Sequence, residues 1–255
     1  MDGRPNANDP RCEASKKRDL ISRGDNTPTP GGKALFVILR SLDPLLQYSI
    51  LAHGTGTPLL HRLGLRTLPP GLPTNTSISF IDGLGLSPYR LVLLGMAVGS
   101  AVKQNIWVMA LSGEPMDVRN AVSISAFNTV VNGLNQYAFL LSATSASTES
   151  NFPQYPLIVG SALYVTGILA ELIAEAQRKR FKADPKNKGK PYTGGLWSLA
   201  RHINYGAYTI WRAGYATAAG GWIFGAIIGS MFFSDFATRA VPILNKYCEK
   251  RYRED

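Results

Sequence analysis

The sequence is poor in several residue types that define common protein classes. Among its 255 residues are only two cysteines and three histidines, too few for a disulfide scaffold, a zinc finger or a histidine-rich metal site. Charged residues make up 17% of the chain, below the roughly 25% usual in soluble domains. The sequence has no phosphate-binding loop, nucleophile triad or soluble dinucleotide fingerprint. These absences argue against the commonest classes of soluble enzyme.

Long apolar blocks fill most of the chain instead. They run over residues 34–52, 89–111, 121–146, 156–174 and 196–245, and the third contains no charge at all. A membrane span needs roughly 20 apolar residues, and the last block is long enough for two helices joined at Gly220-Gly221. We therefore predict an all-α polytopic membrane bundle of about six spans. A soluble bundle with several buried helices is the alternative, disfavoured because soluble helices usually show water a polar face.

The ends and one connector carry most of the positive charge. Lysine and arginine number 27 against 17 acids, a net charge of +10. No groove-reading helix or aromatic platform accompanies these cations, so we expect no nucleic-acid partner. Residues 1–33 are polar and rich in proline and mixed charge, which predicts a disordered cytosolic tail. The basic connector contains Arg178, Lys179, Arg180, Lys182, Lys186, Lys188 and Lys190.

The charge distribution also predicts an orientation. The positive-inside rule places the basic connector in the cytosol, and six spans then put both termini there too. The loop over residues 54–88 would be lumenal, and it carries Asn75-Thr76-Ser77, a glycosylation acceptor that functions only in the lumen. We therefore expect a multi-pass protein of the endoplasmic reticulum membrane. Its oligomeric state is left open.

A motif block occupies the region after the fourth apolar block. It reads Gln177-Arg178, then Phe181-Lys182, then Gly195-Leu196-Trp197, then Arg201-His202-Ile203-Asn204-Tyr205. This block resembles the C-terminal half of the integral-membrane steroid 5α-reductase and sterol C14-reductase superfamily, whose members reduce carbon–carbon double bonds with NADPH. The likeness extends from about Ala174 to the end and includes Tyr247-Cys248 and Arg251-Tyr252. It implies a lipid-substrate half over residues 34–173 and a cofactor-binding half with two membrane helices over residues 174–255.

The resemblance assigns NADPH contacts to particular residues. Arg178 and Lys182 would meet the adenosine-side phosphates, and their spacing of four does place them on one helical face. Trp197 would lie against the cofactor, and Tyr252 would close the site. The pyrophosphate and nicotinamide would be surrounded by Arg201, His202, Asn204 and Tyr205.

The chain departs from the family pattern in ways that keep other functions open. Where relatives continue with glycine and a carboxylate, this chain reads Gly206-Ala207-Tyr208. Membrane methyltransferases that bind S-adenosylmethionine share a similar Arg-His-Pro-x-Tyr block, and a non-catalytic paralogue is a third alternative. Ile203 in place of proline favours the reductase, as does the basic connector, because the methyl donor carries no phosphate.

The remaining candidates concern the lipid or sterol-like substrate. Asn128, Asn132 and Asn135 fall on one helical face, which must point inward because lipid cannot satisfy amides. They are predicted to line the substrate cavity or, alternatively, to form interhelical hydrogen bonds. Glu171 and Tyr208 are the candidate proton donors.

Two further charge placements follow from the spacing. Lys103 is expected to extend toward the cytosolic interface, with a position in an internal cavity as the alternative. Arg40 and Asp43, three residues apart, are expected to pair.

Overall fold

The computed structural model describes residue 25, residues 27–147 and residues 152–251. Within these ranges all regular structure is helical apart from one isolated bridge between Thr67 and Leu141, which confirms the all-α prediction. The helices are α2 (Pro30–His53), α3 (Thr57–Arg62), α4 (Ser79–Asp82), α5 (Pro88–Ile106), η1 (Trp107–Leu111), α6 (Val118–Leu140), α7 (Tyr155–Ala183), η2 (Pro185–Asn187), η3 (Gly195–Ser198), α8 (Ile203–Asp235), η4 (Phe236–Ala240) and α9 (Val241–Arg251).

Four helical stretches in the described ranges are long and apolar enough to cross a membrane. Many of their large apolar side chains are exposed, among them Leu45, Val102 and Ile227, as expected of a surface that faces lipid rather than water. These features support a membrane protein, whereas the count of six spans stays a prediction. The four stretches are Pro30–His53, Pro88–Leu111, Tyr155–Ala183 and Ile203–Glu249.

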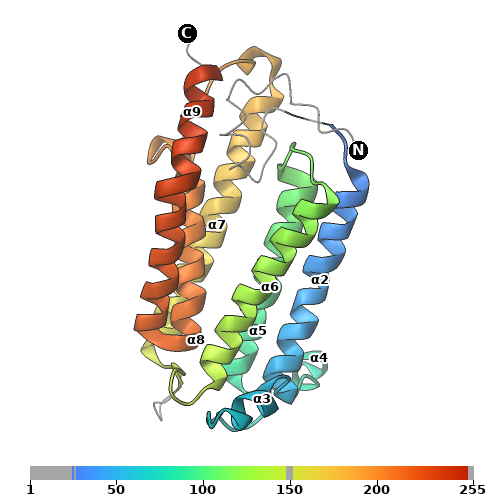
Figure 1. Ribbon diagram of the computed structural model, residues 1–255, viewed down its shortest axis with the longest axis vertical. Helices are drawn as coiled ribbons and strands as arrows, with labels where there is room; N and C mark the ends of the chain where they lie inside the picture. Colours follow the sequence, from blue (N-terminus) through green and yellow to red (C-terminus); the bar gives the residue numbers. More distant parts are fainter. Residues whose placement is uncertain (1–24, 26, 148–151, 252–255) are drawn as a thin grey trace.

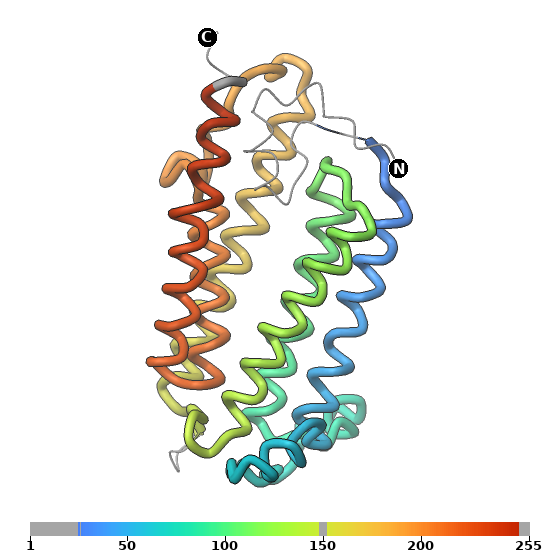
Figure 2. The backbone as a smooth tube through the Cα atoms, in the orientation of Figure 1, coloured from blue at the N-terminus to red at the C-terminus, as the bar shows by residue number. Residues whose placement is uncertain are grey.

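The last of these stretches reverses direction at a glycine pair. Gly220 and Gly221 leave helical geometry, and Gly221 has φ 77° and ψ −170°, a conformation that residues with a Cβ rarely adopt. The chain therefore descends in the first part of α8, over residues 203–219. It returns through the second part and η4 into α9 (Figures 1 and 2). Tyr89 donates to the Ala218 carbonyl at 2.7 Å, which satisfies an oxygen freed at the reversal.

Helices α7 and α8 pack with their backbones in close contact. A Cβ added at Gly167 would lie 2.6 Å from the Trp211 nitrogen, and one added at Gly160 would lie 2.5 Å from the Ala218 nitrogen. Small residues permit this approach in membrane helices. The α7–α8 pair thus fixes the side chains that line their shared face.

The helices form two groups, with α2, α5 and α6 on one side and α7, α8 and α9 on the other (Figure 1). The start of α2 and the end of α9 lie at the same end of the bundle as the basic connector, which we call the connector end. The loop with α3 and α4 lies at the opposite end. Cytosolic placement of the connector end stays a prediction.

The predicted disordered tail over residues 1–33 falls mostly outside the described residues. Its last four residues, Pro30 to Lys33, already belong to α2.

Candidate functional site

A row of buried or half-buried polar side chains runs from the connector end of the α7–α8 pair into the middle of the bundle. We call it the polar row. The carboxylates of α7, Glu175 and Glu171, are one helical turn apart, roughly 5.4 Å, and the antiparallel α8 brings Asn204 to the first and Trp211 to the second. The members of the polar row are Arg178, Glu175, Asn204, Glu171, Lys103, Tyr208, Trp211, Arg212, Asn128, Gln104, Asn132, Arg40, Asp43 and Gln47.

The outer part of the polar row is built around Glu175. This carboxylate is buried and accepts from Arg178 Nη2 at 2.6 Å and from Asn204 Nδ2 at 2.9 Å. The Arg178 side chain is 42% exposed, and its guanidinium lies 5.5 Å from the Trp197 ring centroid. The side-chain oxygen of Asn204 is buried without a hydrogen-bond partner among the described residues. The structure therefore brings Arg178, Trp197 and Asn204 together, as the resemblance implied.

The segment around η3 is fastened to α7 by motif residues. Gln177 Oε1 accepts from the Leu196 backbone nitrogen at 2.9 Å, and Trp197 Nε1 donates to the Ala174 carbonyl at 2.8 Å. Gly195, with φ 56°, turns the chain directly against the Gln177 side chain. These contacts explain why the block needs glutamine, glycine and tryptophan at their positions.

Other predicted cofactor residues lie at the surface or contact α9. Lys182 is exposed and donates to the Lys190 carbonyl. Arg201 is exposed as well. The ring of His202 bonds Asn245 of α9 at 2.9 Å.

Tyr205 stacks on Phe236 with the ring centroids 4.7 Å apart and the planes 10° apart, so the start of α8 packs against η4. Tyr252 lies outside the described residues.

The middle of the polar row contains both candidate proton donors. Glu171 forms an ion pair with Lys103 of α5 and accepts from Trp211 Nε1 at 2.8 Å. Lys103 Nζ also lies 5.7 Å from the Tyr208 ring centroid. The prediction that Lys103 extends to the interface is wrong: its side chain is buried, because Glu171 supplies a counter-ion inside the bundle.

The inner part of the polar row holds the asparagine face of α6. Asn128, Asn132 and Asn135 are all buried, which confirms that this face points inward. Arg212 donates to Asn128 and, at 3.1 Å, to Asn132. These contacts fit the interhelical hydrogen-bonding interpretation. Neither side-chain atom of Asn135 has a partner among the described residues, and a substrate role for the three amides stays a prediction.

Asp43 connects the inner amides to α2. It accepts from Asn132 Nδ2 at 2.7 Å and from Gln47 at 2.8 Å. It also pairs with Arg40 at 3.2 Å, with both side chains fully buried, which confirms the expected pair.

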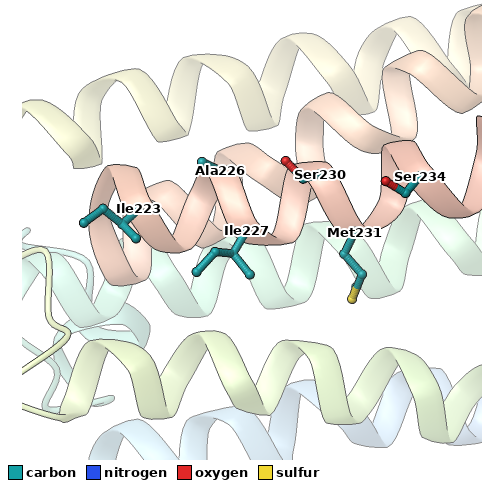
Figure 3. Close-up of a pocket in the computed structure, with 6 residues that line it drawn as sticks. All are labelled: Ile223, Ala226, Ile227, Ser230, Met231 and Ser234. Atoms are coloured by element: carbon teal, nitrogen blue, oxygen red, sulfur yellow. The ribbon is translucent and has the colours of Figure 1, made fainter.

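A hollow of about 580 Å³ lies away from the polar row, on the second part of α8. All six lining residues come from this one helix (Figure 3), so the hollow is an open outer face rather than an enclosed site. It is lined by Ile223, Ala226, Ile227, Ser230, Met231 and Ser234. Within the described ranges no group of histidine, cysteine and acidic residues is placed to hold a metal ion.

Sequence reasoning missed the residues that organise the polar row, above all Arg212 and Glu175. Arg212 was hidden in a block taken as apolar, although a charge inside a membrane span is itself a functional signal. Glu175 precedes the basic connector in the sequence, and its burial depends on a contact with Asn204 of α8.

The fold and site together define an apolar helical bundle, with membrane-spanning character, that carries a buried polar row. Residues 118–255 match a family described as "Protein of unknown function (DUF1295)", which includes steroid 5α-reductase-like proteins, and the chain belongs to this family. The chain is also 40% identical over 240 residues to a protein of Ustilaginoidea virens named "Probable O-methyltransferase ustE". That alignment covers 92% of this chain and 84% of the relative. No solved structure matches.

Proposed function

We propose that the chain is a membrane-embedded reductase that transfers hydride from NADPH to a carbon–carbon double bond of a lipid-like substrate. The observation that carries the proposal is the polar row, which joins the basic connector end to a buried cluster of an acid, two cations and a tyrosine. A phosphate-rich cofactor and a proton-requiring reaction would together explain both ends of the row.

The connector end fits a polyanionic cofactor. Residues 178–190 contain seven cations against one acid, Asp184, a field that attracts phosphates and repels the positively charged S-adenosylmethionine. The unpartnered, buried oxygen of Asn204 suits an N–H or O–H donor, such as the nicotinamide carboxamide or a ribose hydroxyl. When bound, NADPH would supply the hydride.

The middle of the polar row fits a proton donor. Tyr208 lies one helical turn inward from Asn204, and its hydroxyl accepts from Arg212 Nε at 3.1 Å. That bond leaves the hydroxyl's own proton available, and Arg212 would stabilise the phenolate that remains after the proton reaches the substrate carbon. Glu171 holds Lys103 beside the same ring. We therefore assign proton donation to Tyr208 and the positioning of Lys103 to Glu171.

The proposed topology agrees with this chemistry. Six spans, with the connector end in the cytosol, give the site access to cytosolic NADPH and place the α3–α4 loop in the lumen. We propose the endoplasmic reticulum membrane as the location, with a lipid or sterol-like substrate reached from the bilayer.

Ligand-dependent thermal stability of the purified protein in nanodiscs tests the cofactor, because a ligand that binds only the folded state raises the melting temperature. NADPH is expected to stabilise the protein and S-adenosylmethionine is not. The double variant Arg178→Ala/Lys182→Ala should weaken NADPH binding at least ten-fold and NADH binding far less. The variant Arg62→Ala/Arg66→Ala removes the same charge at the opposite end and is the control. Equal losses for both nucleotides would remove the assignment to the 2′-phosphate.

A second candidate function is methyl transfer from S-adenosylmethionine, favoured by the name of the 40% identical relative. The buried carboxylate of Glu175 and the Trp197 ring would suit a positively charged methyl donor. Stabilisation by S-adenosylmethionine but not by NADPH would select this function. Stabilisation by neither ligand would favour a non-catalytic paralogue.

A further inference from the structure

Arg212 is a buried cation whose hydrogen-bond partners within the described residues are all neutral. Its guanidinium donates to Asn128, to Asn132 at 3.1 Å and to the Tyr208 hydroxyl at 3.1 Å. No part of Arg212 is exposed to solvent. No salt bridge joins Arg212 to a carboxylate among the described residues. Burial of a guanidinium without a counter-ion is costly.

The other cations in the middle of the bundle are neutralised. Arg40 pairs with Asp43, and Lys103 pairs with Glu171. In the middle and inner parts of the polar row three cations therefore face two carboxylates, which leaves a net charge of +1 there, because Glu175 in the outer part already pairs with Arg178. Arg90, also buried, lies at the opposite end, where it donates to the Pro69 carbonyl at 2.8 Å.

The surroundings of Arg212 also hold unused hydrogen-bonding atoms. Arg40 Nε, Gln47 Oε1 and Gln104 Oε1 are buried without a partner among the described residues. Each belongs to a side chain already tied into the polar row: Gln104 donates to Asn128 at 2.6 Å and Gln47 to Asp43 at 2.8 Å. Buried polar atoms are normally satisfied, so this cluster has room for a further polar group. Arg40 Nε could donate to an anionic oxygen, whereas the two glutamine oxygens could only accept from an O–H or N–H group.

Aromatic rings surround the same guanidinium. It lies 4.2 Å from the centroid of the Trp211 ring, 5.2 Å from that of Tyr208 and 5.7 Å from that of Phe232. An apolar, planar molecule that brings a negative oxygen to Arg212 would therefore contact ring surfaces with the rest of its body.

We propose that Arg212 binds an anionic oxygen that the substrate itself carries, in a carboxylate or a phenolate. This inference rests on the proposed function, and it narrows the substrate from any apolar alkene to one that carries such an oxygen. The bond between Arg212 and Tyr208 then places the bound oxygen beside the proton donor.

The test uses a shape-matched pair of probes, 2-naphthoate and its neutral amide, 2-naphthamide. Binding to the full-length protein in nanodiscs, without cofactor, is measured by calorimetry at pH 7. Wild-type protein is expected to bind 2-naphthoate at least ten-fold more tightly than 2-naphthamide. Equal affinities for the two probes would overturn the proposal.

The informative variant supplies the missing counter-ion from the protein itself. Asn128→Asp places a carboxylate against Arg212, so it should raise the melting temperature and weaken 2-naphthoate binding at least ten-fold without changing 2-naphthamide binding. Asn135→Asp is the matched control. It makes the same change on the same helix, at a side chain that makes no bond to Arg212, and should lower the melting temperature and keep the preference for 2-naphthoate.

The outcomes separate this proposal from the proposed function. Selective 2-naphthoate binding that Asn128→Asp abolishes, in a protein that NADPH does not stabilise, would support the anion site and contradict the NADPH-dependent reductase. Stabilisation by NADPH with no preference between the two probes would support the reductase and contradict the anion site. A preference that survives Asn128→Asp would also overturn the anion site, because the ion would then bind elsewhere.

Discussion

Trp211 donates its indole N–H to Glu171 at 2.8 Å across the α7–α8 interface, and the other oxygen of Glu171 pairs with Lys103 of α5. This one carboxylate therefore joins the α2–α5–α6 group to the α7–α8–α9 group. Because the contact is buried, its loss should affect the stability of the whole bundle and not only a local helix.

The Lys103–Glu171 pair gives a direct test of that coupling. Either Lys103→Met or Glu171→Gln leaves one buried group uncompensated and should cost about 3–5 kcal/mol of unfolding free energy. The double variant should cost much less than the sum, since no charge remains unpaired. Unfolding is followed by denaturant titration in mild detergent. Arg239→Met, which breaks a half-exposed pair with Asp235, should cost only about 0–1 kcal/mol. Strictly additive losses in the double variant would contradict the coupling.

The close approach of α7 and α8 predicts a second stability effect. In Gly167→Ala the new Cβ would meet the backbone of α8 at Trp211 and Ala207, so the helices must separate, at a cost of about 1–3 kcal/mol. Gly95→Ala on α5 is the control, because nothing lies within 4 Å of its added Cβ. It should be neutral or stabilise by up to about 1 kcal/mol. Equal melting temperatures for the two variants would show that the backbone contact is not rigid.

Much of the fold can be predicted from the lengths of the apolar blocks and from the position of one glycine pair. The blocks predict the long helices, and Gly220-Gly221 marks the reversal inside α8, because two adjacent residues without Cβ atoms interrupt an otherwise continuous apolar run. Helix α6 shows the limit of this reasoning. Its block contains no charge, but its asparagines and serines lower its hydropathy, and it is not among the four stretches with membrane-spanning character.

The site was harder to predict from the sequence, because a buried charged side chain can be recognised only together with the residue that neutralises it. Lys103 and Glu171 are 68 residues apart, so the sequence alone could not show that they neutralise each other. The motif block did identify Arg178, Trp197 and Asn204 as neighbours. It could not show that Glu175 binds both Arg178 and Asn204, since that depends on the register between α7 and α8.

The loop at the opposite end should respond to acid. Asp82 accepts from the Thr76 nitrogen at 2.7 Å and from its hydroxyl at 2.8 Å, and these bonds lower the pKa of Asp82 below its ordinary value of 3.8. The ordering that they provide is complete above the unfolded-state pKa and is lost as the pH falls through the lower folded-state pKa. Hydrogen exchange at the Thr76 amide, corrected for intrinsic rates, should therefore accelerate below about pH 4.

Asp82→Asn should remove that pH dependence and leave Thr76 fast-exchanging throughout. Asp184→Asn, the same change at the connector end, serves as the comparison and should preserve the wild-type profile. If Thr76 remains protected through pH 2 in the wild-type protein, the carboxylate does not order this loop.

Proton donation by Tyr208 is tested by removing one oxygen atom. Tyr208→Phe keeps the ring that packs against Trp211 and Phe232, so NADPH affinity should be unchanged. Loss of a general acid should lower the turnover rate by about 10²–10⁴-fold. The assay incubates a lipid extract with NADPH deuterated at the transferred position and follows product mass for the addition of one deuterium and one hydrogen.

The control for Tyr208→Phe is Tyr137→Phe, which removes a hydroxyl bonded to the Thr55 carbonyl at 2.8 Å, at the opposite end of the bundle. It should retain the wild-type rate. Undiminished turnover in Tyr208→Phe, together with loss of turnover in Glu171→Gln at full NADPH affinity, would assign the role of proton donor to Glu171 instead. Lys103 would then stabilise the carboxylate that remains after Glu171 gives up its proton, and the Arg212–Tyr208 bond would serve only to position the substrate oxygen.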